Sequence, residues 1–205
     1  MIEFLDNALQ LGVLGACVAL SLINFLRCRS DEWLMVFGFF GCCFLGLTYW
    51  TFYLLAFGET PSYFYVSDLA WAAGYLFLLM LVASLDERRR PSPPVPAAWL
   101  VIVVMVPLFV LYSMYGDVLL NFVDCAIVGA IGFFAVRGLA ATSIDGPEGS
   151  RPLHLCVLTW WVAQLAVWTT SCFWGAESLT PYIVSDIVVT VMYLVILITM
   201  RRTLA

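Results

Sequence analysis

An aspartate and a tyrosine recur with the same spacing in the two halves of this chain. Asp68 is followed seven residues later by Tyr75, and Asp186 is followed seven residues later by Tyr193. On a helix, a separation of seven residues places two side chains on the same face, two turns apart. A pair of carboxylates in such a setting can bind a cation or an amine, or share a proton. The pattern therefore predicts a ligand or proton site.

The two aspartates follow helix-start signals. Thr60-Pro61 and Thr180-Pro181 each place a capping residue before a proline at the first helical position. The aspartates then lie about 8–10 Å further along each helix, beyond its first turn. At this depth a carboxylate should face the bundle interior or an aqueous cavity. We expect Asp68 and Asp186 to line such a cavity together with the two tyrosines, and Asp124 to join them at a similar height.

A second interpretation of the same carboxylates stays open. They could interact with the positive ends of helix dipoles and with interfacial water, which is a structural role rather than a binding role. If the site exists, four further residues that recur in both halves are expected to surround it: Trp50, Trp168, Glu59 and Glu177.

Several chemistries lack the residues that they need. The chain has no lysine, which excludes a retinal Schiff base, and its single histidine, His154, excludes bis-histidine haem and a HExxH zinc site. A P-loop and a Gly-x-Gly-Asp protease motif are also absent. We therefore expect a protein that is not an enzyme and that has no metal site, no cofactor and no nucleic-acid partner.

The elements that must position these residues are transmembrane helices. The chain is 63% hydrophobic and only 11% charged, whereas a soluble domain carries about 25% charged residues. Apolar stretches of about 20 residues, enough to cross a bilayer, account for nearly all of residues 1–205. We predict a single all-α membrane domain with seven spans: 6–27, 33–57, 61–85, 97–115, 118–140, 154–175 and 181–200.

The arginines predict how these spans are oriented. All nine basic residues are arginines, and they occur only in alternate connections. Connections rich in arginine stay cytoplasmic, which predicts a multi-pass protein of the inner (plasma) membrane with its N-terminus outside and its C-terminus inside. The outer side then holds no basic residue, so its field should attract cations. It carries eight acids: Glu3, Asp6, Glu59, Asp68, Asp117, Asp124, Glu177 and Asp186.

When the sequence is aligned with itself at an offset of 118 residues, identical residues recur in the two halves. This shift aligns Trp50-Thr51 with Trp168-Thr169, and Val66-Ser67-Asp68 with Val184-Ser185-Asp186. It predicts a parallel 3+1+3 repeat in which residues 4–86 form repeat one, 97–115 the linker helix and 118–202 repeat two. In architecture alone, this layout is similar to that of SWEET-type transporters.

The third predicted span carries a family resemblance. Thr60-Pro61-Ser62, the run Val66-Ser67-Asp68-Leu69-Ala70-Trp71 and then Gly74-Tyr75-Leu76 resemble a stretch in bacterial seven-helix sensory input domains. Those domains precede diguanylate cyclase, phosphodiesterase or histidine kinase modules, and they have the same predicted orientation. The resemblance implies a non-enzymatic sensor. We expect either an isolated sensory domain or one that pairs with a separate cytoplasmic output protein.

Two functional hypotheses follow. The first is a membrane sensor or receptor-like module, embedded in the lipid bilayer, whose acidic outward-facing cavity binds a small cationic or neutral ligand. The alternative is a small-solute or cation transporter or channel of 3+1+3 architecture, with the same carboxylates on its translocation path.

Overall fold

The computed structural model contains seven helices. It describes residues 2–61, 66–87, 95–142, 151–176 and 178–203. Each helix is long and apolar enough to cross a membrane, which confirms the predicted all-α fold with seven membrane-length helices. They are α1 (Ile2–Cys28), α2 (Asp31–Phe57), α3 (Val66–Glu87), α4 (Pro96–Ser113), α5 (Val118–Thr142), α6 (Arg151–Ser171) and α7 (Pro181–Thr203).

The helix start predicted at Pro181 is confirmed, whereas the one predicted at Pro61 is wrong. Ser30 caps α2, where its side chain accepts a 3.3 Å hydrogen bond from the backbone N–H of Trp33. Pro181 is the first residue of α7, as predicted. The predicted start of the third span at Pro61 was wrong: Pro61 is not helical, and α3 is described from Val66. Asp68 therefore lies in the first turn of its helix, whereas Asp186 lies deeper in α7.

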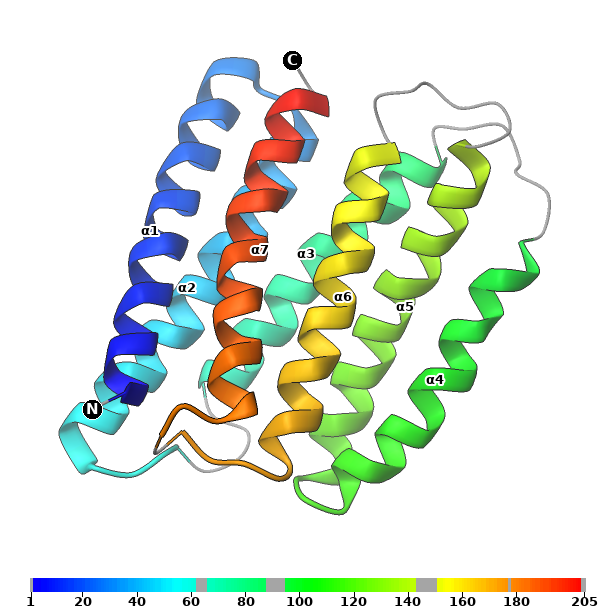
Figure 1. The fold of residues 1–205 in the computed structure, drawn as a ribbon. Coiled ribbons are helices and arrows are strands. Elements are labelled where there is room, and N and C mark those ends of the chain that lie inside the picture. The colour runs from blue at the N-terminus through cyan, green and yellow to red at the C-terminus, as the bar shows by residue number, and fades with distance from the viewer. Residues whose placement is uncertain (1, 62–65, 88–94, 143–150, 177, 204–205) are drawn as a thin grey trace.

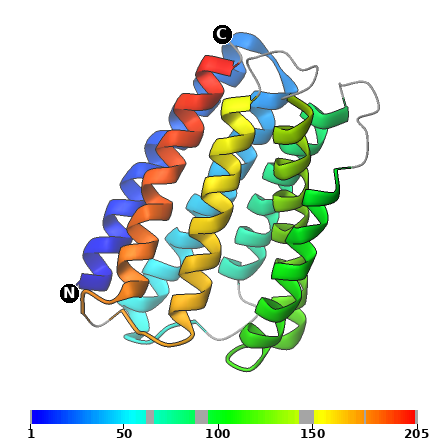
Figure 2. The same cartoon turned by 45° about the vertical axis from the view of Figure 1, so that its right-hand side comes forward.

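Six of the helices form a closed ring. Around it, α1 packs against α2, α2 against α3, α3 against α5, α5 against α6, α6 against α7, and α7 against α1. The first and last helices are thus neighbours, as the blue and red ribbons of Figures 1 and 2 show. Helix α4 lies outside the ring, against α5 and marginally against α6.

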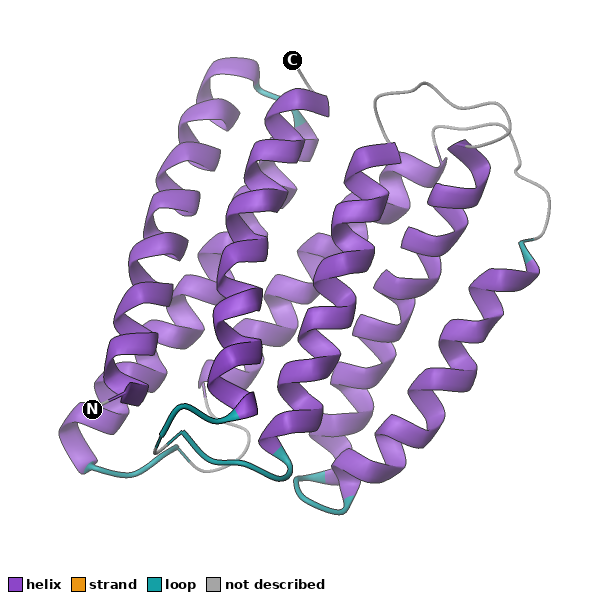
Figure 3. Cartoon of the chain, in the orientation of Figure 1, coloured by secondary structure: helices purple, strands orange, loops and turns teal. Residues whose placement is uncertain are grey.

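The two ends of the bundle differ in charge. The lower end in Figure 1 holds the start of α1 and the connections α2–α3, α4–α5 and α6–α7; we call it the acidic end. The upper end, which we call the arginine end, holds every arginine that the structure describes. The acidic end holds none within the described ranges, but it carries Glu3, Asp6, Glu59, Asp68, Asp117, Asp124 and Asp186. Short loops make several of these connections (Figure 3).

An aromatic layer fills the middle of the ring. Trp160 of α6 and Phe40 of α2 are fully buried. The ring centroid of Phe39 lies 5.8 Å from that of Trp160 and 5.9 Å from that of Tyr193. Tyr75 joins the layer from α3, at 5.6 Å from Trp160. This layer is packed rather than open, so it separates the acidic half of the ring from the arginine half.

Candidate functional site

A cavity of about 260 Å³ lies inside the ring at the acidic end. Five helices contribute to it, namely α1, α2, α3, α6 and α7. It extends from Tyr182 to Tyr193 along α7, about 16 Å at 1.5 Å per residue. Its lining consists of aromatic side chains, a few aliphatic ones and a small polar set. The lining residues are Asn7, Gln10, Leu47, Trp50, Trp71, Tyr75, Gln164, Val167, Trp168, Ser171, Tyr182, Asp186, Val189 and Tyr193.

Asp186 is the carboxylate that lines this cavity. Gln10, across the α1–α7 contact, donates a hydrogen bond of 3.1 Å from its Nε2 to Oδ1 of Asp186. The same amide donates a second bond of 3.0 Å to the hydroxyl of Thr190, one turn further along α7. Gln10 is only 8% exposed. The bond to Thr190 fixes the amide of Gln10, and the bond to Asp186 holds that carboxylate in a defined position at the cavity wall.

A second carboxyl group lies beside the first. Asp6, one turn before Gln10 on α1, is in side-chain hydrogen-bonding contact with Asp186. Asp6 is 7% exposed, and its Oδ1 has no hydrogen-bond partner. The site is therefore a pair of acids from the first and last helices, of which Asp186 faces the cavity.

One polar group of the lining is left unsatisfied. Asn7 is 7% exposed, and its Nδ2 has no hydrogen-bond partner. A buried amide donor without a partner is costly, so such groups are rare in folded proteins unless something else binds to them. Because Asn7 lines the cavity, its N–H groups can donate to an occupant.

Six of the lining residues are aromatic. The rings of Trp50 and Trp71 lie with their centroids 5.7 Å apart at an interplanar angle of 43°. On the other side, the ring of Trp168 lies 6.1 Å from that of Tyr75. Aromatic faces attract cations, and the attraction strengthens where water is excluded. The combination of several rings and one carboxylate suits a positively charged organic group.

Five of the predicted site residues meet at this cavity. Asp186, Tyr75 and Tyr193 line it, and so do two of the residues expected to surround the site, Trp50 and Trp168.

The predicted partnership of Asp68 with Asp186 is not what the structure shows. Asp68 does not line the cavity; it lies in the first turn of α3. Asp68 interacts electrostatically with Asp124 of α5. Glu59 is exposed on the connection that follows α2, and Glu177 lies outside the described residues. Four of the acids at the acidic end thus interact in two separate pairs, Asp6 with Asp186 and Asp68 with Asp124.

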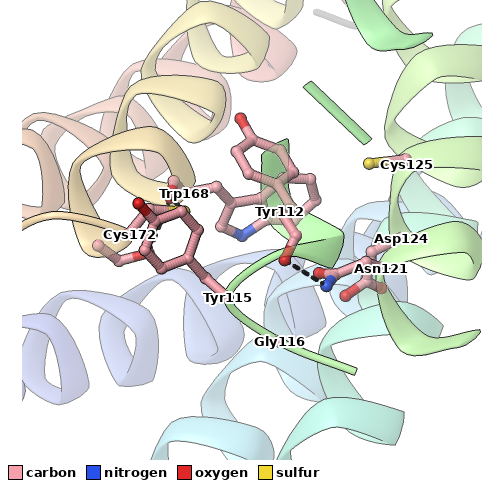
Figure 4. Close-up of a pocket in the computed structure, with 9 residues that line it drawn as sticks. Tyr112, Tyr115, Gly116, Asn121, Asp124, Cys125, Trp168 and Cys172 are labelled. Atoms are coloured by element: carbon pink, nitrogen blue, oxygen red, sulfur yellow. Dashed lines mark hydrogen bonds between the residues drawn. The ribbon is translucent and has the colours of Figure 1, made fainter. Parts of the chain in front are cut away.

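Asp124 lines a second and smaller pocket of about 180 Å³. This pocket lies where the connection between α4 and α5 approaches the end of α6 (Figure 4). The amide Nδ2 of Asn121 donates a 3.0 Å hydrogen bond to the backbone oxygen of Tyr112 at its edge. Trp168 lines both pockets, so its indole forms a shared wall between them.

Sequence reasoning missed the contribution of the first helix. Asn7 and Gln10 lie in an otherwise apolar span, and polar residues within a span usually face the bundle interior. Asp6 and Gln10 are also four residues apart, which places them on one helix face. This spacing was the available signal, but it does not say that the partner is the last helix.

The described residues contain no group of three His, Cys, Asp or Glu side chains placed to hold a metal ion. His154 lies in the first turn of α6, and its side chain is fully buried against Gly138 of α5. Comparison with protein-family models, with curated proteins and with solved structures found no match to this chain.

Proposed function

We propose that this chain is a multi-pass membrane protein that binds a small organic cation in the central cavity. The observation that carries the proposal is the composition of the cavity: the Asp186 carboxylate faces a space whose walls are largely aromatic. A carboxylate supplies the opposite charge, and aromatic faces accept an alkylated ammonium that cannot donate hydrogen bonds well. No arginine of the described residues lies at this end to neutralise Asp186 internally.

The size of the cavity limits the ligand class. An engineered cavity of roughly 150 Å³ holds benzene, and drug-sized ligands occupy roughly 300 Å³ or more. A volume of about 260 Å³ therefore suits a compact molecule such as a small quaternary amine.

The charge distribution supports an outward-facing cavity. Connections that carry arginine are retained in the cytoplasm, and all described arginines lie at the end opposite the cavity. This orientation places the N-terminus and the acidic end outside the plasma membrane. The acids at that end would concentrate cations near the opening.

The cavity suits a receptor that is not an enzyme. Its lining comes from both halves of the chain, so an occupant would contact α1, α2 and α3 together with α6 and α7. The aromatic layer of Phe39, Phe40 and Trp160 closes it toward the arginine end. Ligand binding would then be signalled by a change in the positions of the helices, and the ligand would not pass through the bundle. The resemblance of the third span to sensory input domains supports this role, with a separate cytoplasmic protein as the output partner.

A second candidate function is transport, and it is favoured by the order of helices in the ring. Under the shift of 118 residues, α1, α2 and α3 correspond to α5, α6 and α7. Every contact of the ring then maps onto another contact of the ring: α1–α2 onto α5–α6, α2–α3 onto α6–α7, and α3–α5 onto α7–α1. A 3+1+3 repeat with α4 as its linker accounts for this pattern. Repeats that enclose a central site are characteristic of transporters.

Choline binding tests the proposal. The purified protein in lipid nanodiscs is titrated with choline and, separately, with 3,3-dimethyl-1-butanol, the neutral molecule of the same shape. Binding is measured by calorimetry and by the tryptophan fluorescence of the protein, to which Trp50, Trp71 and Trp168 of the cavity wall contribute. Choline should bind and the neutral analogue should bind far more weakly. Equal binding of the two, or binding of neither, would refute a cation site.

A matched pair of variants locates the site. Asp186→Asn should weaken choline binding about ten- to a hundredfold, because an interaction with a charged group contributes about 1.5–3 kcal/mol. Asp117→Asn removes a charge from the same end and retains the cap of α5, where the Asp117 carboxylate accepts a 2.9 Å bond from the backbone N–H of Leu120. It should bind choline like the unmodified chain. Uptake of choline by proteoliposomes that contain only this protein would favour the transport alternative.

A further inference from the structure

Asp186 lines the central cavity, and Asp6 of α1 interacts with it to form a carboxyl pair. The two side chains interact across the α1–α7 contact, where Gln10, one turn after Asp6 on α1, donates a 3.1 Å hydrogen bond to Asp186. An ionised carboxylate can only accept hydrogen bonds, so two carboxyl groups bond to each other only when one of them carries a proton. Like charges at such a distance cannot both remain ionised without a compensating cation.

Among the described residues, none of the groups around the pair is such a cation. Tyr182, on α7 itself, interacts with both acids of the pair and also with Glu3, another acid of α1. From α3, Tyr75 interacts with Asp186, and from α7 so does Tyr193. The neighbouring α6 carries only Arg151 and His154 as basic groups, both in its first turn at the arginine end. The groups that face the pair are thus acids, tyrosines and the neutral amide of Gln10.

We propose that the central cavity exchanges a proton for its organic cation, with the Asp6–Asp186 pair as the exchange site. This inference rests on the proposed function. In the exchange, the O–H bond of the protonated carboxyl group breaks and the proton passes to water at the acidic end. The cation then binds beside the two carboxylates without forming a covalent bond.

The net charge of the site explains why exchange of the proton for the cation is favoured over binding of the cation to the pair while it keeps its proton. The pair with one proton carries a charge of −1, and the ionised pair with one bound monovalent cation also carries −1. The net charge buried among apolar helices is therefore unchanged, and so no additional charge has to be desolvated.

An observation independent of the acids also points to an occupant at this place. The Asn7 amide lies on α1 directly after Asp6 and lines the same cavity, where its buried Nδ2 has no protein partner. An occupant that carries an oxygen beside its ammonium group, as choline does, could accept this bond while its positive end faces Asp186. The cavity therefore offers complementary groups for both ends of a hydroxylated cation.

Proton release on binding tests the exchange. Choline is titrated calorimetrically into the protein in buffers of different ionisation enthalpy, since its quaternary ammonium has no proton of its own to lose. About one proton should be released per choline bound where the pair is protonated, and the Kd should fall about tenfold for each unit of rising pH in that range. Choline binding without proton release at any value between about pH 5 and about pH 9 would overturn the exchange and leave the proposed function intact. An absence of choline binding would overturn both.

Three variants assign the proton to the pair. Asp6→Asn should still bind choline through Asp186, but without proton release and with a Kd that does not depend on pH. Asp6→Glu should restore the release, which shows that the loss in Asp6→Asn does not come from misfolding. Asp117→Asn should behave like the unmodified chain. Proton release that persists in Asp6→Asn would show that the proton does not depend on the pairing of the two acids, and it would overturn the assignment to the pair.

Discussion

The amide of Gln10, on the first helix, donates hydrogen bonds to both Asp186 and Thr190 on the last, at 3.1 and 3.0 Å. These two bonds cross the contact that closes the ring of six helices. They also hold the carboxylate that faces the central cavity. One side chain thus couples the closure of the fold to the geometry of the site.

Replacing this amide should affect both properties. Gln10→Met keeps the length of the side chain but removes both donors, so the free energy of unfolding should fall by about 1–2 kcal/mol. Choline binding should weaken as well, because Asp186 loses its orientation. Unfolding in mixed micelles of increasing SDS content measures the first effect, and calorimetry the second. Thr190→Val removes one acceptor only and should cost less; an equal or larger cost would contradict the dual role of Gln10.

The glycines of α2 allow a test of the cavity wall. A Cβ atom at Gly46 would lie 2.9 Å from Nε1 of Trp71 and 3.1 Å from the backbone oxygen of Ser67. Gly46→Ala should therefore displace the indole of Trp71, which lines the cavity, and weaken choline binding several-fold. Gly41 lies on the same helix with nothing within 4 Å of such an atom. Gly41→Ala should leave choline binding unchanged. A similar loss of choline binding in both variants would contradict the role of Trp71 in the cavity wall.

Two tyrosines near the end of α4 test how this outer helix is attached. Tyr112 is 5% exposed, and its hydroxyl lies 2.9 Å from that of Thr169 and 3.3 Å from the backbone oxygen of Leu165, both on α6. Tyr112→Phe should lower the free energy of unfolding by about 1 kcal/mol. Tyr115 is 52% exposed, so Tyr115→Phe should be neutral. SDS titration of the two proteins measures the difference, and equal stabilities would show that the α4–α6 bonds contribute nothing.

The orientation across the membrane is tested by cysteine labelling. Cys28 is exposed at the arginine end, and Glu59→Cys, in a chain that also carries Cys172→Ser, places a thiol at the acidic end. A membrane-impermeant maleimide should label the new cysteine in intact cells, whereas Cys28 should react only after the membrane is permeabilised. Labelling of Cys28 in intact cells would reverse the proposed orientation, and the cavity would then open to the cytoplasm.

The helices were predictable because their causes are local. A run of about 20 apolar residues has to form backbone hydrogen bonds within itself in a bilayer, and this requirement can be read from any single segment. The start of α7 at Pro181 was predictable for the same reason. The start of α3 was not, because Pro61 allows a helix to begin there without requiring it. In the structure Asp68 therefore lies in the first turn of α3 rather than deeper in the helix, and it does not line the cavity.

The sequence by itself determined seven membrane-length helices, with one bundle end rich in acids and one rich in arginine. It also predicted a site that includes Asp186, Tyr75 and Tyr193, which line one cavity. Only the tertiary structure decided which acids are neighbours. Asp68 and Asp186 correspond under the sequence shift of 118 residues, yet residues that correspond in sequence need not be in contact. Helix packing brings α7 against α1 and α3 against α5, so Asp186 interacts with Asp6, and Asp68 acts electrostatically on Asp124. These pairings depend on contacts between segments far apart in the chain, which the local pattern of residues does not encode.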